Sequence, residues 1–179
     1  TKEIKQGGKQ TGGDLVTAAS FIDFEFVFEW KQSVAGNSGV LYFARNLGGK
    51  LNGHEYQIID DMRHPDGLKG GPMKRTGSLY GVLPPAENKT LADAGAWNEG
   101  RIVVRGNQVE HWLNGAKVLT YDLGSPALLE AVRASHAKVH PQFGFKTRTS
   151  IVLLDEGDEI SFRNLKVRAL NLPATPARK

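Results

Sequence analysis

The chain has 179 residues, of which 40% are hydrophobic, and this length predicts one domain around a single core. It contains no cysteine, which excludes disulfides, thiolate metal sites and a cysteine nucleophile. The formal net charge is +4, but lysine and arginine form no stripe for nucleic acid, and the apolar runs are too short to span a membrane.

The first strongly patterned element follows residues 1–13, which are polar and glycine-rich and predict a loop or a weakly ordered edge. The run FIDFEFVFEWK, residues 21–31, alternates between apolar and polar residues. Its aromatic residues fall on one face: Phe24, Phe26, Phe28 and Trp30. The pattern predicts a β-strand whose aromatic face lies in the core.

The next two runs, VLYFAR and HEYQIID, predict strands separated by a loop, NLGGKLNG, at residues 46–53. In the second strand, alternation puts Glu55, Gln57 and Ile59 on one face. A face with such polar groups is wet, either because the sheet faces solvent or because a concave sheet holds a polar ligand. The loop after it, residues 62–75, is long and rich in Gly and Pro, and we expect it to border the site.

The second half of the chain also predicts mainly strands. Two-residue turns at Gly106-Asn107 and Asn114-Gly115 join three alternating runs into an antiparallel meander over residues 101–122. A short helix is expected from Pro126 to about Ala137, capped by Ser125. Two strands and a tail follow. We therefore predict an all-β, two-sheet antiparallel sandwich or jelly roll, with one domain over residues 1–170 and a flexible tail over 171–179.

Several motifs in the same order resemble the 3-keto-disaccharide hydrolase family: DFEFVFEWK, NSGVLYFAR, GHEYQIIDD, TGSLYGVLPP, AWNEGRIVVRGNQVEHWLNGAKV and GDEISFRNLKV. The resemblance implies a concanavalin A-like lectin/glucanase sandwich that is secreted or periplasmic. Members usually open with a segment of the type LFNGKDLSGW, so the resemblance also implies a first strand that this sequence lacks. Where many members have LQDHGD, this chain has LLDEGD, which places Glu156 at the family's histidine.

The resemblance implies cleavage of the glycosidic bond of 3-keto-glycosides. A ketone at C3 acidifies the C2 proton, so a base can remove it and the group on C1 can leave by elimination, after which water adds. Such a site needs a base, donors at the enolate oxygen and an acid for the leaving oxygen. We assign these roles to Glu55, Arg45 and His111 respectively, against the simpler alternatives of a solvated carboxylate, a surface arginine and a packed histidine.

Further polar and aromatic residues are candidates for substrate binding. They are Gln57, Asn37, Tyr80, Trp97 and Glu29. Asp60 and Asp61 end the strand of Glu55, and with Glu55 and His54 or His64 they are candidate oxygen and nitrogen ligands for a divalent cation. The alternative for two adjacent aspartates is a turn.

Two other functions fit the same fold. A lectin-like carbohydrate-binding module would bind sugars without turnover. A conventional glycoside hydrolase would use a carboxylate pair such as Glu25 and Glu29, whose Cα atoms on one strand are about 13 Å apart. That spacing is long for a retaining enzyme. In each case the expected partner is an oligosaccharide or glycoside, and not nucleic acid.

Overall fold

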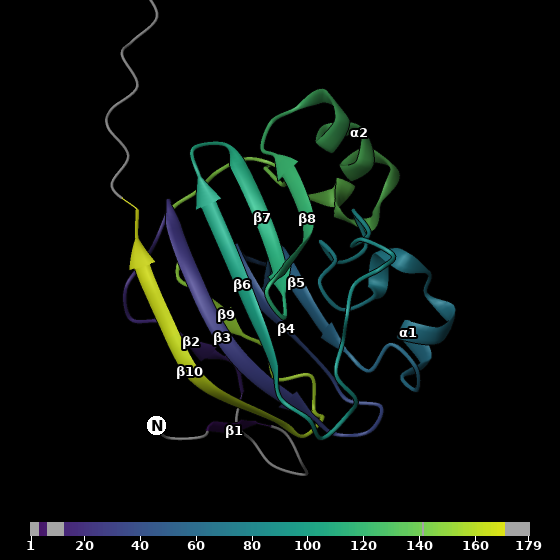
Figure 1. Cartoon of the computed structure of the whole chain (residues 1–179). Helices are drawn as coiled ribbons and strands as arrows, with labels where there is room; N and C mark the ends of the chain where they lie inside the picture. Colours follow the sequence, from purple (N-terminus) through teal and green to yellow (C-terminus); the bar gives the residue numbers. More distant parts are fainter. Residues whose placement is uncertain (1–3, 7–12, 141, 171–179) are drawn as a thin grey trace, which may run out of the picture.

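The structure, a computed structural model, describes residues 4–6, 13–140 and 142–170 (Figure 1). The elements in chain order are β1 Ile4–Gln6, β2 Leu15–Val16, β3 Phe24–Gln32, β4 Asn37–Leu47, β5 Lys50–Ile59, α1 Pro65–Lys69, the 3₁₀ helix η1 Pro72–Lys74, β6 Asn98–Arg105, β7 Gln108–Leu113, β8 Ala116–Asp122, α2 Pro126–Ala134, the 3₁₀ helix η2 His136–Val139, β9 Val152–Leu153 and β10 Ile160–Ala169. The predicted tail, residues 171–179, lies outside the described residues.

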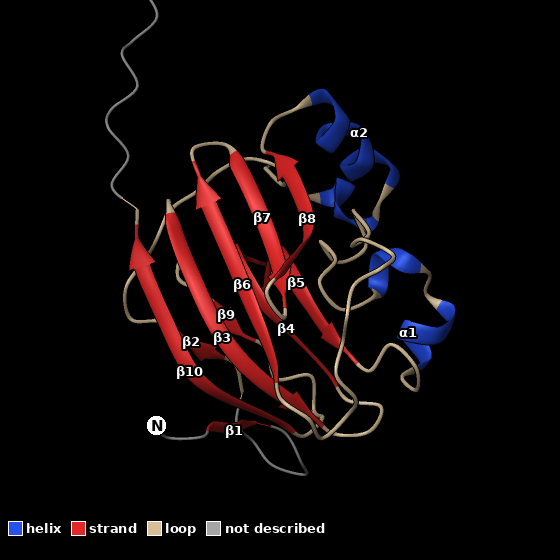
Figure 2. Cartoon of the chain, in the orientation of Figure 1, coloured by secondary structure: helices blue, strands red, loops and turns tan. Residues whose placement is uncertain are grey.

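The strands form two sheets, one with the order β1-β10-β3-β6-β7-β8 and one with the order β2-β9-β4-β5. Neighbouring strands pair antiparallel throughout the described residues. This confirms the predicted antiparallel sandwich. The helices gather on one side of it, next to β5 and β8 (Figure 2). No helix among the described residues is both long enough and apolar enough to cross a membrane.

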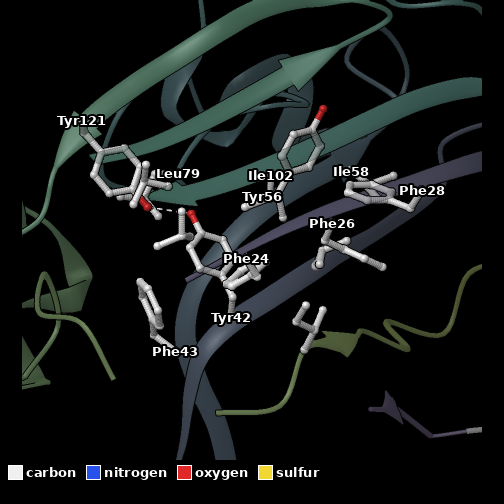
Figure 3. Packing of buried hydrophobic residues seen from close by; sticks show 14 of the residues in the cluster. Phe24, Phe26, Phe28, Tyr42, Phe43, Tyr56, Ile58, Leu79, Ile102 and Tyr121 are labelled. Atoms are coloured by element: carbon white, nitrogen blue, oxygen red, sulfur yellow. Dashed lines mark hydrogen bonds between the residues drawn. The ribbon is translucent and has the colours of Figure 1, made fainter. Parts of the chain in front are cut away.

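The core lies between the two sheets, and β3 supplies its aromatic centre. Side chains of β3 alternate between buried and partly exposed, as predicted, with Trp30 and Phe28 fully buried. The other sheet contributes Tyr42 and Tyr56, whose rings meet Phe24 and Phe28 edge-on at centroid distances of 6.1 and 5.4 Å (Figure 3). Such edge-to-face aromatic contacts hold the two sheets together.

Strands β4 and β5 form a hairpin that differs from the prediction. Residues 46–53 were expected to be a loop, but both strands extend through most of this segment and only a tight turn remains. Gly48 and Gly49 make that turn with φ of 62° and 90°, which are values that favour glycine. A register shift between Tyr42 and Arg45 interrupts the pairing. The long hairpin therefore carries polar residues well away from the sheet centre.

The remaining predictions about elements are mostly confirmed. The meander is present as β6, β7 and β8. Helix α2 begins at Pro126, and Ser125 caps it by accepting a hydrogen bond from the Leu128 N–H. The long loop at residues 62–75 contains α1 and η1, which were not predicted.

Candidate functional site

Glu55 lies on the face of the four-stranded sheet that points away from the core. Its neighbours Tyr56 and Ile58 point inward, where both are fully buried. The Glu55 carboxyl leans over Gly39 of β4, because a Cβ atom placed on Gly39 would lie only 2.5 Å from Glu55 Oε1. The absence of a side chain at Gly39 therefore makes the room that the carboxyl occupies.

The segment after the long loop runs along the free edge of β5. The Gly77 N–H donates to the Gln57 carbonyl, and the Tyr80 N–H donates to the Glu55 carbonyl. A bridge between Tyr56 and Leu79 extends this pairing. The backbone of the segment thus places the Tyr80 side chain next to Glu55, which brings two of the predicted site residues together.

Glu55 lines a partly polar cavity with a volume of about 180 Å³. The sheet forms one wall of this cavity, and the other walls come from segments far away in sequence. Its acidic, histidine and aromatic lining residues are Glu55, Tyr80, His136, His140, Phe143 and Glu156. We call this space the Glu55 cavity. It collects two carboxylic acids, a phenol and two imidazoles around one small volume.

The electrostatics of the cavity favour a protonated Glu55. Burial raises the pKa of the Glu55 carboxyl to about 8, and the negative charge of Glu156 adds to the effect. Burial also raises the pKa of Glu156, with contributions from nearby aspartates. No ion pair with another described residue offsets either shift. A carboxyl with a pKa near neutrality is suited to moving protons.

Two histidines of the cavity were missed by the sequence analysis. His136 packs against Tyr80 with ring centroids 5.7 Å apart, and burial lowers its pKa. The Nδ1 atom of His140 is buried and has no hydrogen-bond partner among the described residues. The signal in the sequence was the SHAKVH run, residues 135–140, at the end of the predicted helix, with its histidines four residues apart. A buried ring nitrogen without a hydrogen-bond partner is uncommon in folded proteins, and it marks His140 as a candidate site residue.

A second cavity, of about 260 Å³, adjoins the first and shares Asn52, Gly53, His140 and Phe143 with it. We call it the apolar cavity. Arg45 lines it and donates from Nη2 to Thr147 Oγ1 at 2.9 Å. Arg45 was predicted to stand beside the reacting ketone. The structure places it in this adjoining space instead, because the register shift in β4 separates it from the row of Glu55.

His54 and His111 lie in the core. His111 Nδ1 is 2.9 Å from the carbonyl of Gly77, which can only accept, so this nitrogen carries a proton. The N–H of Gly144 donates to His54 Nε2, so that nitrogen carries none. Burial lowers the pKa of His54 to about 3 and that of His111 to about 4, which keeps both rings neutral.

Two tyrosines connect these histidines. Tyr42 accepts a hydrogen bond from Tyr121 at 2.6 Å (Figure 3). Tyr42 also donates to His111 Nε2 at 2.6 Å, and Tyr121 accepts from His54 Nδ1 at 2.8 Å. Burial raises the pKa of both tyrosines, so their hydroxyls keep their protons. The bonds form one directed chain from the Gly144 loop to the Gly77 loop. We call it the core hydrogen-bond chain.

This placement corrects the role predicted for His111. The side chain is fully buried, and both ring nitrogens are engaged in the core hydrogen-bond chain. It cannot reach a substrate in the Glu55 cavity. Alternation along β7 puts His111 on the same face as Val109 and Leu113, and the structure shows that this is the core face.

Asp60 and Asp61 hold the backbone rather than a cation. Asp60 accepts two backbone N–H bonds and pairs with an arginine. Asp61 accepts from the Thr76 N–H and from Lys89 Nζ, while His64 caps α1. Throughout the described residues, no group of three acidic or histidine side chains is arranged to hold a metal ion. The geometry therefore does not support the predicted cation site.

Trp97, Glu25 and Glu29 lie on the outer face of the other sheet. Glu29 accepts from Arg163 at 2.7 Å and from Asn164 at 2.6 Å, and these bonds lower its pKa. The Arg163 guanidinium stacks 3.9 Å above the Trp97 ring. Glu25 pairs with other arginines. The predicted roles of Glu29 and Trp97 in substrate binding, and of Glu25 and Glu29 as a catalytic pair, are not supported by this placement.

Asn37 and Gln57 are close to Glu55 but do not line its cavity. Gln57 is 1% exposed, and its Nε2 donates to Asn37 Oδ1 at 3.2 Å. Both lie farther from the hairpin turn than Glu55 does, near the start of β4 and the end of β5. They support the sheet beside Glu55.

A family model described as "3-keto-alpha-glucoside-1,2-lyase-like domain" matches residues 2–168. The chain belongs to this family. The match confirms the family predicted from the motifs. A curated relative from Bacteroides thetaiotaomicron, named 3-keto-disaccharide hydrolase, is 33% identical over 89% of this chain. The chain spans 63% of that relative's length.

Solved structures share the sandwich. One from Parabacteroides distasonis, whose description provisionally assigns it to the glycosyl hydrolases, has a TM-score of 0.82 and 28% identity, covering 94% of this chain and 81% of its own. The carbohydrate-binding module CBM66 from Bacillus subtilis has a TM-score of 0.51 and 13% identity, covering 89% of this chain and 84% of its own. At that identity the second likeness concerns the fold alone.

Proposed function

We propose that the chain cleaves the glycosidic bond of 3-keto-glycosides, with net hydrolysis proceeding through removal of the C2 proton and elimination. The observation that carries this proposal is the Glu55 carboxyl, which lines a partly polar cavity and has a pKa of about 8. The family of the chain and the name of its Bacteroides relative support the substrate class.

Glu55 is the base in this proposal. Its carboxylate takes the proton from C2, and the electrons of the C–H bond form an enolate with the C3 oxygen. A base whose pKa is close to the operating pH is efficient at such a step. Tyr80 is the donor to the enolate oxygen, because it lines the same cavity and burial raises the pKa of its phenol, which therefore keeps its proton.

His140 is the acid. When the enolate collapses, the C3 ketone re-forms, a C1–C2 double bond appears and the C1–O bond breaks. The departing oxygen then takes a proton from the His140 ring, which lies in the wall shared by the two cavities. Water adds to C1 and gives its proton to the His140 imidazole, and C2 recovers a proton from the Glu55 carboxyl, so both groups return to their starting states. The sum of these steps is hydrolysis.

The first test compares a 4-nitrophenyl 3-keto-glucoside with its unoxidised glucoside. We expect release of nitrophenol from the keto substrate alone, and a loss of about 10²- to 10⁴-fold in kcat for Glu55→Gln. Glu130→Gln, at an exposed position on α2, is the matched control and leaves the rate unchanged. If neither substrate is cleaved while sugars still bind, the chain is a binding module.

The second test separates the acid from the base. The 4-nitrophenolate ion is a weak base and can leave without being protonated. Methoxide is a strong base and needs a proton from an acid as it leaves. We therefore expect His140→Gln to slow cleavage of methyl 3-keto-glucoside about 100-fold and that of the 4-nitrophenyl substrate only a few-fold. An equal loss on both substrates would remove His140 from the acid role.

A further inference from the structure

The two cavities meet at a common wall, and this wall has an ordered aromatic side chain. Phe143 stacks on His54 with ring centroids 4.4 Å apart and an interplanar angle of 18°. His54 is itself held by the core hydrogen-bond chain. Phe143, at the boundary between the Glu55 cavity and the apolar cavity, is therefore packed against the core through His54.

The linings of the two cavities differ in chemistry. The exposed lining of the apolar cavity is mostly apolar and includes Phe43, Leu47, Phe143 and Phe145. Its polar residues are Arg45, Asn52, His54, His140 and Gln142. Burying a sugar ring there would leave hydroxyls without partners on the phenylalanine side, which is unfavourable. An aromatic ring would instead gain contacts with the phenylalanines, and its face would accept the planar guanidinium of Arg45.

The size of the apolar cavity also fits one ring. A dry cavity of about 150 Å³ is sufficient to bind benzene in another protein. The apolar cavity has about 260 Å³ and adjoins the Glu55 cavity at the four residues that line both. A ring attached to the glycosidic oxygen would reach it while the sugar stays beside Glu55.

We propose that the apolar cavity is the subsite for the leaving group and that it selects an aromatic aglycone. The proposal rests on the proposed function, since it assigns the oxidised sugar to the Glu55 cavity. The glycosidic oxygen then lies at the shared wall, beside His140.

The test uses benzyl and methyl 3-keto-glucosides of the same anomer, whose leaving alcohols have similar acidity. The wild-type chain is expected to favour the benzyl substrate at least about tenfold in kcat/KM, because the benzyl ring is buried. Phe145 lines the apolar cavity but not the Glu55 cavity. Its side chain is 48% exposed, so its truncation does not disturb the core. Phe145→Ala should lower the preference about fivefold through KM, with kcat/KM for the methyl substrate unchanged.

Leu68→Ala is the matched control, because Leu68 is an exposed apolar residue on α1, 53% accessible and outside both cavities. It should change kcat/KM for neither substrate. Equal efficiency on benzyl and methyl substrates in the wild-type chain would overturn the proposal. So would a 3-keto-disaccharide that is cleaved more efficiently than the benzyl substrate, or an equal loss on both substrates in Phe145→Ala.

Binding to the Glu55→Gln variant, measured by calorimetry, gives a second measurement that needs no turnover. Tighter binding of the benzyl than of the methyl 3-keto-glucoside, abolished by Phe145→Ala, supports the subsite even if no substrate is cleaved. That combination would reject the proposed function and retain the subsite. Equal binding of the two glycosides would reject the subsite.

Discussion

The protonation of Glu55 depends on its neighbour Glu156, and this coupling predicts a pH profile. With Glu55 as base and a pKa of about 8, kcat/KM should rise about tenfold per pH unit below pH 8 and level off above it. Glu156→Gln removes a negative charge that helps to raise the Glu55 pKa. Its profile should therefore shift to lower pH. Values of kcat/KM for the 4-nitrophenyl 3-keto-glucoside between pH 5 and 10 give the profiles of the wild-type chain and of Glu156→Gln. An unshifted profile in Glu156→Gln would contradict the coupling.

The core hydrogen-bond chain predicts a stability cost at Tyr121. In Tyr121→Phe the buried Nδ1–H of His54 loses its acceptor, and it cannot change tautomer because the Gly144 N–H donates to the other nitrogen. We expect a loss of about 1–3 kcal/mol in the free energy of unfolding. Urea denaturation measures it. Tyr80→Phe is the control, because the Tyr80 hydroxyl contacts only partly exposed side chains, Asp66 at 3.5 Å and Lys74, so its loss should cost less. Equal costs would argue against the directed chain.

The sequence predicted some of these residues because strand alternation shows which side chains share a face. Glu55 and Tyr80 do lie together in the cavity. Alternation does not show which face another layer covers, so His111 was assigned to a site although it lies in the core. His136 and His140 reach the cavity from η2 and its C-cap, more than 80 residues away from Glu55 along the chain. No local pattern encodes that contact.

At the scale of elements, the pairing of β4 with β5 determines the position of the base. Gly39→Ala keeps an ordinary strand backbone but puts a Cβ atom on the Glu55 carboxylate. The flexible end of Glu55 is displaced rather than the strand, so we expect at least about a tenfold loss of kcat with little change in the melting temperature. The glycoside assay and thermal unfolding measure these two quantities.

A double-variant cycle makes the same prediction sharper. If Gly39 acts only through Glu55, Gly39→Ala added to Glu55→Gln should cause no further loss, so the two effects are not additive. Additive losses would show that Gly39→Ala disturbs the cavity by another route. The cycle therefore tests the packing of one carboxyl on one glycine.

The main elements were predictable because their patterns are long and regular, as in β3 and the meander with its Asn-Gly turn. Helices α1 and η1 were not, since both are very short and begin at proline in a segment rich in glycine. Short helices of this kind depend on tertiary contacts more than on local propensity. Here the Lys74–Asp66 ion pair joins the two, and Tyr80 packs beside it.

At the scale of the whole molecule, the outer faces of the two sheets carry carboxylates in opposite states. On the six-stranded sheet, Glu25 and Glu29 are paired with arginines, and the pKa of Glu29 is lowered. On the four-stranded sheet, Glu55 has a raised pKa. Paired carboxylates stabilise a fold, whereas an unpaired and partly buried one opposes it once it ionises.

This contrast predicts opposite effects of the same substitution on the two faces. Glu55 holds its proton up to about pH 8 when folded, and releases it near its ordinary value of 4.5 when unfolded. The folded state binds more protons between these pH values, so Glu55 destabilises the fold as pH rises, and Glu55→Gln should raise the melting temperature at pH 8 relative to pH 5. Glu29 has the opposite shift, so its contribution is present above pH 4.5 and lost as pH falls.

Glu29→Gln should therefore lower the melting temperature at pH 7 while kcat on the keto substrate stays within about twofold. Glu55→Gln should instead raise the melting temperature and greatly lower kcat. Thermal unfolding followed by circular dichroism, together with the nitrophenol assay on the same preparations, measures the four values. Loss of activity in Glu29→Gln would mean that the six-stranded face takes part in the chemistry. If Glu55→Gln leaves the melting temperature at pH 8 unchanged, ionisation of the Glu55 carboxyl does not destabilise the fold. The raised pKa that suits Glu55 to act as a base would then not be accompanied by a loss of stability.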